Sequence, residues 1–314
     1  MEKIKMMNNK SGITLNDAYT NFLRKCKIKN LSESTIYGYQ EKLKLFLDYA
    51  NNIPLTQFNT HTVDNYVVYL REHTGCNDIS VNTYLRTLRA FLYYGMDCNY
   101  MPRFKVSLIK ADKPLKETYT DDELSRLLEK PNTNKCNFHE YKIWVFENFL
   151  LGTGVRLSTA LNIKVNDIDY ENGLIRLCKT KNRRQTMIPL SNTLASILTE
   201  YMTIRGGNED DLLFCNEYGQ PASARSYQLA VSRFNRRRNV NKTSIHAFRH
   251  TFATKYILAG GSVETLCRIM GHSSITVTMG YVDMVATDLT PNFERFNPLD
   301  QIAKNKKERE VQRL

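Results

Sequence analysis

The first hundred residues place apolar side chains three or four positions apart, the period of an α-helix with one buried face. These apolar runs lie at residues 18–23, 36–50, 63–70 and 81–93. Thr14 can cap the first run, Ser32 or Ser34 opens the second, and Gly75 ends the third. We therefore predict four helices joined by short polar turns, which form a small all-α domain over residues 14–102.

The helical period stops at residues 103–118, which carry five lysines or arginines around Pro114 and therefore read as a linker. Directly after it, Thr120 and Glu123 stand three apart as a capping box, so a new helix begins a second domain. We predict a flexible N-terminus at 1–13, a helical domain at 14–102, a linker at 103–118, a second domain at 119–290 and a C-terminal tail at 291–314.

The second domain mixes helices with two short strands. An apolar run over residues 144–151 predicts a helix that ends at a glycine turn. Residues 174–178 and 185–188 read as strands on either side of a polar stretch, which predicts an antiparallel hairpin. Further helices are predicted at 191–204, 223–238, 246–259, 263–270 and 274–286. The chain is thus predicted to be mainly α-helical, with a small antiparallel β-sheet in its second domain.

Both parts of the chain are basic. The 314 residues include 44 lysines and arginines against 32 acidic side chains, a formal net charge of +12. Residues 1–112 hold 15 basic and 10 acidic side chains, and residues 113–314 hold 29 and 22. A surplus in both parts favours a polyanion that both domains grip.

The composition also indicates the cellular compartment in which the protein is expected. No apolar run reaches eighteen residues and the mean hydropathy is −0.45, so we expect no membrane span. The N-terminal residues lack the apolar core of a signal peptide. The seven cysteines are scattered without a C-x-x-C pair, which suits a reducing compartment and argues against a disulfide framework or a zinc site. We therefore expect a cytoplasmic protein.

Candidate chemistry begins at a predicted helix N-terminus. His246 and Arg249 stand three apart in its first turn, so they share a face where free N–H groups and the helix dipole favour an anion. The spacing of His246 and His250 would suit a metal, but the zinc-protease pattern needs a glutamate where Ala247 stands. We therefore predict an anion site and no metal site.

Three more residues belong with this pair. Arg156 follows a glycine turn in T-G-V-R, His272 follows Gly271, and Tyr281 lies nine residues later on the next predicted helix. Each alone has an ordinary structural explanation as a surface or packing residue. Taken with H-x-x-R in this order, they resemble the catalytic set of the tyrosine recombinase (phage integrase) family. The resemblance is close over residues 120–290, and the four-helix domain is similar to the family's SAM-like core-binding domain by pattern.

The resemblance also implies a lysine in the hairpin. Lys181 is favoured over Lys179 because it stands eight residues before Pro189 of the second strand, where the family's lysine usually sits. Thr159 departs from the family pattern, since many members carry an acidic residue three positions after the first arginine. The implied catalytic residues are Arg156, Lys181, His246, Arg249, His272 and Tyr281.

In the mechanism that the resemblance implies, Arg156 and Arg249 present planar forks to the non-bridging oxygens of a phosphodiester. His272 adds a hydrogen bond as charge builds on those oxygens. Tyr281 attacks and forms a 3′-phosphotyrosyl link, with His246 as the candidate base.

The rest of the implied reaction concerns the leaving strand and the assembly. Lys181 protonates the departing 5′ hydroxyl, and neither a metal nor another cofactor is required. The implied enzyme is a site-specific recombinase that acts as a homotetramer on two DNA duplexes through a Holliday junction. The C-terminal tail either passes to a neighbouring protomer, as it often does in the family, or is a frayed end.

Basic and amide side chains outside this set are candidate DNA contacts, with a solvated polar face as the alternative for each. Helical spacing puts Arg233 and Arg237 on one face, so we expect them to act together and at least one of Arg236 and Arg238 to make no contact. The candidates are Asn82, Arg86, Arg89, Arg183, Arg184, Arg225, Arg233, Arg237 and Lys242.

Two other classes compete with a recombinase. A type IB topoisomerase-like enzyme shares the chemistry but relaxes DNA as a monomer. A non-catalytic DNA-binding protein of the same fold would be expected to lack the nucleophile or an arginine. Only about thirteen residues precede the first predicted helix, so we expect no separate arm-site DNA-binding domain. This favours a chromosome-resolution recombinase or a small mobile-element integrase, and leaves both open.

Overall fold

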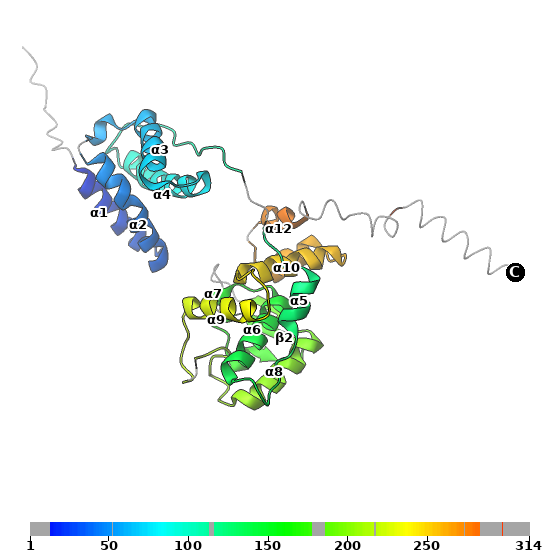
Figure 1. Ribbon diagram of the computed structural model, residues 1–314. Helices are drawn as coiled ribbons and strands as arrows, with labels where there is room; N and C mark the ends of the chain where they lie inside the picture. The colour runs from blue at the N-terminus through cyan, green and yellow to red at the C-terminus, as the bar shows by residue number, and fades with distance from the viewer. Residues whose placement is uncertain are drawn as a thin grey trace, which may run out of the picture. The chain divides into compact units, whose positions relative to one another are not determined.

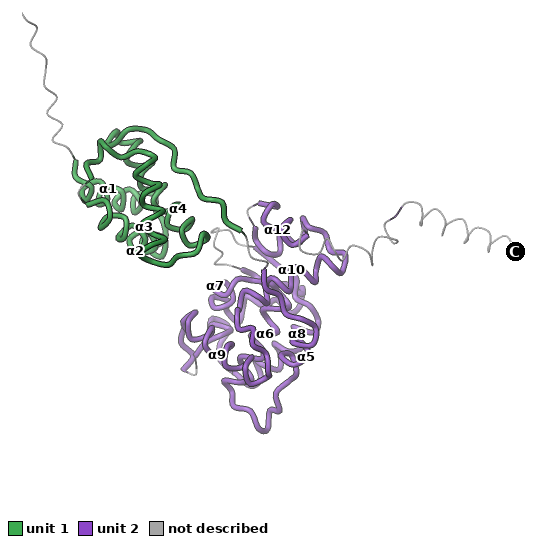
Figure 2. The backbone as a smooth tube through the Cα atoms, turned by 45° about the horizontal axis from the view of Figure 1, so that its top comes forward, with its two compact units in different colours: residues 1–114 green, residues 115–314 purple. Residues whose placement is uncertain are grey.

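The computed structural model describes residues 13–51, 53–112, 116–177, 186–216, 218–272, 274–282 and 297. The chain divides into two compact units, unit 1 at residues 1–114 and unit 2 at residues 115–314 (Figure 2). This boundary falls inside the segment that the sequence predicts as a linker. Each unit buries a hydrophobic core of its own.

Unit 1 contains the four predicted helices (Figure 1). They are α1 (Leu15–Ile28), α2 (Glu33–Ala50), α3 (Thr60–Thr74) and α4 (Asp78–Asp97). Thr14 and Asp17 cap each other at the start of α1, and Ser32, rather than Ser34, caps α2. Gly75 ends α3 in the left-handed conformation, at φ 61°. A single turn of 3-10 helix at Leu55–Gln57, which the sequence pattern does not predict, precedes α3.

Aromatic rings fill much of the core of unit 1. Phe22 of α1 meets Phe91 of α4 edge to face, with ring centroids 5.6 Å apart. Phe46 of α2 meets Tyr66 of α3 in the same way at 5.0 Å. All four rings are buried, and edge-to-face pairs of this kind add to the free energy gained from apolar burial. The four helices therefore share one core.

Part of the predicted linker belongs to unit 1. Residues 101–112 run along α4 in the opposite direction, with Met101 and Val106 buried in the core. Near the far end, the Asn82 side chain donates to Ile109 O at 2.9 Å and accepts from Ile109 N at 3.0 Å. The buried amide of Asn82 thus satisfies the backbone N–H and C=O of Ile109, which regular secondary structure would otherwise pair.

Unit 2 is mostly helical, as predicted. Its helices are α5 (Asp121–Leu128), α6 (Phe138–Thr153), α7 (Leu157–Ala160), α8 (Asn192–Arg205), α9 (Ala224–Arg237), α10 (Ile245–Leu258), α11 (Val263–Ile269) and α12 (Ile275–Val282). Thr120 and Glu123 form the predicted capping box of α5. The last predicted helix continued to residue 286, and its residues after 282 lie outside the described part of the chain.

A three-stranded antiparallel sheet lies beside these helices in the order β1 (Ile168–Asp169), β2 (Leu174–Leu177), β3 (Thr186–Pro189). Ile175 faces Ile188 across the central pair, and both side chains are buried. The predicted hairpin strands are confirmed, and β1 adds a short edge that was not predicted. The residues that join β2 to β3 lie outside the described structure.

Helix α6 lies in the middle of unit 2, with α5, α8, α9 and α10 packed around it (Figure 1). Phe146 and Phe149 are fully buried, and Trp144 is 4% exposed while its indole N–H donates to Leu128 O. Residues 141–147 are all buried, so this part of α6 is enclosed on every side, as in a core helix. The C-terminal end of α6 is therefore a rigid support for the turn that follows it.

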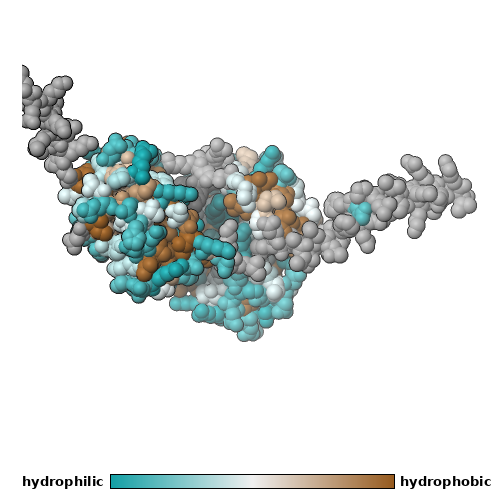
Figure 3. Space-filling model, turned by 90° about the horizontal axis from the view of Figure 1, so that it is seen from above, coloured by the Kyte–Doolittle hydropathy of each residue, from teal (hydrophilic) through white to brown (hydrophobic). Residues whose placement is uncertain are grey.

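The surface combines polar side chains with scattered apolar ones. Figure 3 shows brown apolar patches among teal side chains on the face in view. In unit 1 the large exposed apolar side chains include Ile28, Tyr37 and Val68. Among the described residues, none of the helices combines the length and the apolar character needed to cross a membrane.

Candidate active site

The T-G-V-R turn follows the end of α6. Gly154 has a φ of 61°, and a Cβ placed on it would lie 2.3 Å from the ring of Phe252 in α10. Glycine is therefore needed both for the backbone conformation and for the close approach of α10. Arg156 comes two residues later, at the N-cap of α7, with its side chain half-buried.

Arg249 of α10 joins three segments of unit 2. Its Nη1 donates to Gly154 O at 2.6 Å, and its Nη2 donates to Met270 O at 2.7 Å. The same Nη2 lies 2.9 Å from Nε2 of His272. Arg249 is only 6% exposed. The predicted H-x-x-R arginine therefore connects the glycine turn after α6 with the turn after α11.

The guanidinium groups of Arg249 and Arg156 make this region positive. Burial, followed by the charge of Arg156, lowers the pKa of Arg249 to about 10, so the group stays protonated at neutral pH. Across the described ranges, neither guanidinium forms an ion pair with a carboxylate. Two like charges held together in this way favour an anion between them.

His272 is fixed through both ring nitrogens. Its Nδ1 lies 2.8 Å from Oγ1 of Thr278, a fully buried residue of α12, and its Nε2 meets Arg249. Burial, followed by the charges of Arg249, Arg156 and Lys116, lowers the pKa of His272 to about 4. The ring is therefore neutral at physiological pH and can share a hydrogen bond without adding charge.

Tyr281 of α12 lies in the same cluster and is only 2% exposed. Its hydroxyl is 2.9 Å from Nδ1 of His250, its ring stacks on that of His272 at 6.5 Å, and Nζ of Lys116 lies 3.7 Å from its ring centroid. Burial raises the pKa of Tyr281, while the charges of Arg249 and Arg156 oppose that rise. The positive charges of both guanidinium groups thus favour ionisation of this hydroxyl.

His246 lies apart from this hydroxyl. It is exposed in the first turn of α10 and lines a hollow of about 260 Å³ together with Arg225, Gln228 and Ser232. The histidine that hydrogen-bonds to the Tyr281 hydroxyl is His250, one turn further along α10. Sequence reasoning weighed His250 only as a metal ligand. Its position directly after Arg249 was the one available signal for another role.

The structure does not describe the site residues predicted in the hairpin. Lys181, Arg183 and Arg184 lie outside the described residues. Thr159 is 7% exposed, and its backbone N–H donates to Arg156 O at 2.9 Å. Residue 159 therefore contacts the backbone of Arg156 and has no carboxylate to pair with its guanidinium.

The DNA-contact candidates differ in exposure. Arg86 is exposed and Arg89 half-buried on α4, and the three candidates on α9 are all exposed: Arg225, Arg233 and Arg237. Asn82, predicted as a DNA contact, is instead 5% exposed, and both ends of its amide bind Ile109. Lys242 is half-buried and pairs with Glu123 at 2.8 Å. Asn82 therefore stabilises the packing within unit 1, and Lys242 stabilises the packing within unit 2.

Arg238 follows α9 and is also occupied. Its Nη1 donates to Arg126 O at 2.7 Å and to Glu129 O at 2.8 Å, at the C-terminal end of α5. The guanidinium lies 4.5 Å from the ring centroid of Phe234. The neighbouring Arg236 is exposed. Adjacent arginines of this basic stretch therefore have different surroundings.

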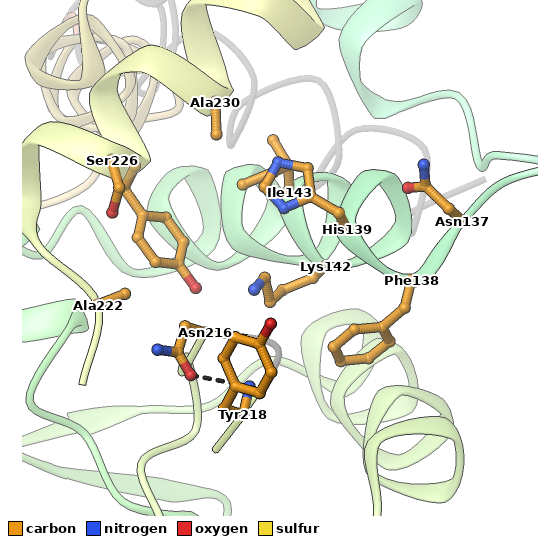
Figure 4. A pocket seen from close by; sticks show the side chains of 11 residues that line it. Asn137, Phe138, His139, Lys142, Ile143, Asn216, Tyr218, Ala222, Ser226 and Ala230 are labelled. Atoms are coloured by element: carbon orange, nitrogen blue, oxygen red, sulfur yellow. Dashed lines mark hydrogen bonds between the residues drawn. The ribbon is translucent and has the colours of Figure 1, made fainter. Parts of the chain in front are cut away.

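A second hollow, of about 550 Å³, lies between the start of α6, the start of α9 and the turn around Tyr218 (Figure 4). Lys142 is 4% exposed, and its Nζ donates to Cys215 O at 2.7 Å and lies 5.6 Å from the ring centroid of Phe138. None of the predicted site residues lines this hollow. Within the part of the chain that is described, His, Cys, Asp and Glu side chains form no cluster of three that could hold a metal.

Comparison with known proteins identifies the two units. The phage integrase family matches residues 117–287, which is more than half of the chain. The N-terminal SAM-like domain of phage integrases matches residues 17–97. These matches cover α1 to α4 in unit 1 and the whole arginine, histidine and tyrosine cluster in unit 2.

Individual relatives agree with this assignment. The chain is 26% identical over 296 residues to the tyrosine recombinase XerD of Staphylococcus epidermidis, covering 91% of this chain and 99% of the relative. The Tn1549 transposon integrase, in complex with a circular intermediate DNA, has a TM-score of 0.71 at 22% identity, over 84% of this chain and 94% of that chain. The XerH site-specific recombinase, bound to a palindromic difH substrate, has a TM-score of 0.67 at 20% identity, over 90% and 84%. The two structures share the fold at these identities, and the two family matches make this chain a member of the phage integrase family of tyrosine recombinases, enzymes that break and rejoin DNA.

Proposed function

We propose that this chain is a site-specific recombinase that cuts DNA with Tyr281, holds the cut strand as a 3′-phosphotyrosyl link and rejoins it to a partner strand through a Holliday junction. The observation that carries the proposal is the placement of the Tyr281 hydroxyl in the same buried cluster as Arg249 and His272. A nucleophile and cationic hydrogen-bond donors within one water-poor site suit attack on a phosphodiester.

Each group answers one requirement of that reaction. A phosphodiester repels a nucleophile because it is itself negative, so Arg156 and Arg249 neutralise its non-bridging oxygens. The neutral ring of His272 accepts from Nη2 of Arg249 and so holds that guanidinium in place. The exposed His246, at the N-terminal turn of α10, is placed where a helix N-terminus favours the phosphate.

The covalent step exchanges one phosphoester for another. The bond from Tyr281 Oη to phosphorus forms as the bond from phosphorus to the 5′ oxygen breaks. We assign Lys181 as the acid that gives the departing oxygen its proton. The phosphotyrosyl link keeps the energy of the original bond, so a 5′ hydroxyl of a second strand can reverse the step without a high-energy cofactor.

Double-stranded DNA is the proposed partner. Basic residues exceed acidic ones in both units, and exposed arginines lie on both α4 and α9, so phosphate contacts from each unit are favoured. Related structures contain a circular intermediate DNA and a palindromic difH substrate. We extend this to a homotetramer that holds two duplexes, because strand exchange needs four cleavage sites.

Tyr281→Phe gives the first test. A library of nicked random duplexes is incubated with the protein, and DNA that stays bound to protein under denaturing conditions is recovered and sequenced. The wild-type chain should enrich one sequence as a covalent adduct. The Phe variant should bind the enriched duplex with wild-type affinity and form no adduct. An adduct with the Phe variant would place the nucleophile elsewhere, and relaxation of a one-site plasmid without two-site recombination would indicate a topoisomerase.

Lys181→Ala tests the assignment of the acid, with Lys179→Ala as the matched control. Cleavage should slow by about a hundredfold or more in the first variant and much less in the second. A 5′-bridging sulfur leaves without protonation, so it should restore cleavage by Lys181→Ala. Failure of that substrate to restore cleavage would remove Lys181 from the acid role. EDTA should leave the wild-type rate unchanged, since no step needs a metal.

A further inference from the structure

The hydroxyl of Tyr281 has a partner that lies outside the six predicted catalytic residues. His250 Nδ1 is 2.9 Å from Tyr281 Oη, and the two ring centroids are 5.7 Å apart. Tyr281 is 2% exposed, so water competes little for this hydrogen bond. From this contact we propose that His250 is the base that takes the phenolic proton of Tyr281 during strand cleavage, an inference that rests on Tyr281 being the nucleophile.

The proton can move along the existing hydrogen bond. The hydroxyl donates to Nδ1 when the imidazole carries its own hydrogen on Nε2. As an electron pair of Oη forms the bond to phosphorus, the proton passes from Oη to Nδ1, and the 5′ oxygen leaves with a proton from Lys181. In the reverse step, the imidazolium of His250 returns its proton to Oη as Tyr281 departs.

The charges around His250 suit this role once DNA is present. Burial, followed by the charges of Lys116, His246 and Arg249, lowers the pKa of His250 to about 4, so the resting ring is neutral and can accept a proton. A scissile phosphate would bring negative charge to the same cations and weaken their effect, which makes the ring more basic. Arg249 and Arg156 favour the phenolate that is left behind.

Lys116 strengthens the arrangement from another segment. Its Nζ lies 3.7 Å from the centroid of the Tyr281 ring, and a cation over an aromatic face attracts the ring more strongly as negative charge develops on it. His246, by contrast, is exposed and makes no hydrogen bond to Tyr281 within the described structure. The contacts thus separate two histidines that stand only one helical turn apart.

His250→Asn and His250→Phe test the inference in the full-length protein, with His246→Asn as the matched change one turn earlier. Adduct formation is measured in single turnover on the enriched nicked duplex. Both His250 variants should slow it by about a hundredfold, while DNA affinity stays at the wild-type value. Asn is smaller than imidazole and polar, so it keeps the experiment readable if the Phe variant does not fold.

The decisive measurement replaces Tyr281 with 3,5-difluorotyrosine, whose phenol ionises at a lower pH and needs less help from a base. It should restore adduct formation by about tenfold or more in the His250 variants. It should give no comparable gain in His246→Asn. A purely structural role for His250 predicts no such rescue.

Two outcomes would overturn the inference alone: a wild-type rate of adduct formation in either His250 variant, or a defect that difluorotyrosine does not relieve. An adduct defect in His246→Asn that difluorotyrosine relieves, without relief in the His250 variants, would return the base to His246. If the wild-type chain itself forms no adduct on any duplex, the proposed function fails, and the role of His250 fails with it.

Discussion

The guanidinium of Arg249 donates to two backbone carbonyls, Gly154 O and Met270 O, that belong to different turns of unit 2. Because the side chain is 6% exposed, water cannot easily replace these bonds. Arg156 is half-buried, and its side chain forms no hydrogen bond within the described residues. Two arginines with the same proposed task on phosphate therefore differ in what they contribute to the fold.

This difference predicts a separation of stability from activity. Arg249→Ala should lower the free energy of unfolding by about 3 kcal/mol, because two buried carbonyls lose their donors. Arg156→Ala should change it by less than about 1 kcal/mol. Both variants should lose adduct formation by about a hundredfold or more. Urea denaturation and single-turnover cleavage measure the two effects, and equal stability of the two variants would contradict the structural role of Arg249.

At the scale of elements, the arginines at the C-terminal end of α9 differ in their exposure and in their hydrogen bonds. Arg233 and Arg237 are exposed and four residues apart, so they share one face of the helix. Arg238, just past the helix end, donates to two carbonyls at the end of α5. The first two are available to phosphates, whereas the third stabilises the packing of α9 against α5.

Salt titrations of DNA binding should separate these arginines. Arg233→Ala and Arg237→Ala should each flatten the dependence of log K on log salt by about one, on cognate and scrambled duplexes alike, since each phosphate contact releases about one counterion. Arg238→Ala should leave that slope unchanged and lower the free energy of unfolding by about 2 kcal/mol. An unchanged slope in both Arg233→Ala and Arg237→Ala would make this face a solvated one.

The elements also show which features could be predicted. Thr14 and Thr120 act through neighbours three residues away, so the sequence predicts the starts of α1 and α5 correctly. β1 has two residues and therefore no readable period. The segment after α4 depends on Asn82, a side chain 27 residues from its partner Ile109, and no local pattern predicts such a bond.

In the candidate site, too, local sequence patterns could be predicted and contacts between distant segments could not. Family order in the sequence locates Arg249, His272 and Tyr281, which the structure brings into one cluster. The contacts of His250 and Lys116 with Tyr281 join α10, α12 and the start of unit 2. These contacts arise from packing of helices that are distant in sequence, so only a three-dimensional structure can assign them.

At the scale of the whole molecule, the two separate cores predict two unfolding transitions. In unit 1, burial is the main cause of the shifted pKa values, which belong to several tyrosines and to Cys26. All of these pKa values are raised, so the groups do not titrate in acid. In unit 2, His250 and His272 have pKa values of about 4 when folded against 6.5 when unfolded. The unfolded chain therefore binds more protons between these values, and stability falls as the pH falls.

Glu147 opposes this trend in unit 2. It is fully buried, and burial raises its pKa well above the usual value of 4.5, so the folded state holds a proton that the unfolded state releases. Above about pH 5.5, where carboxyl groups of lowered pKa such as those of Glu123 and Glu264 are ionised in both states, two histidines against one glutamate leave a net uptake of about one proton on unfolding, a slope of at most about 1.4 kcal/mol per pH unit. The half-buried histidine rings are partly screened by solvent, which makes the expected slope smaller.

Calorimetry between pH 4.5 and 6.5 should therefore show the transition of unit 2 moving to lower temperature in acid while that of unit 1 stays nearly constant. Glu147→Gln removes the opposing proton and should steepen the acid dependence of unit 2. Expression of residues 1–114 alone identifies the transition of unit 1. Equal acid shifts of both transitions would show that the two histidines do not control the response.

Gly154 restricts how this sequence can drift over evolutionary time. Every replacement of a glycine adds a Cβ, and at this position that atom would overlap the ring of Phe252 while the backbone holds a φ of 61°. The carbonyl of the same residue accepts from Arg249, so a backbone shift that relieved the overlap would displace the arginine. No single substitution at Gly154 satisfies all three conditions, and a second change at Phe252 would still leave the backbone strain. Lineages that keep this fold are therefore expected to keep this glycine, whereas no such constraint acts on the exposed side chains of α9.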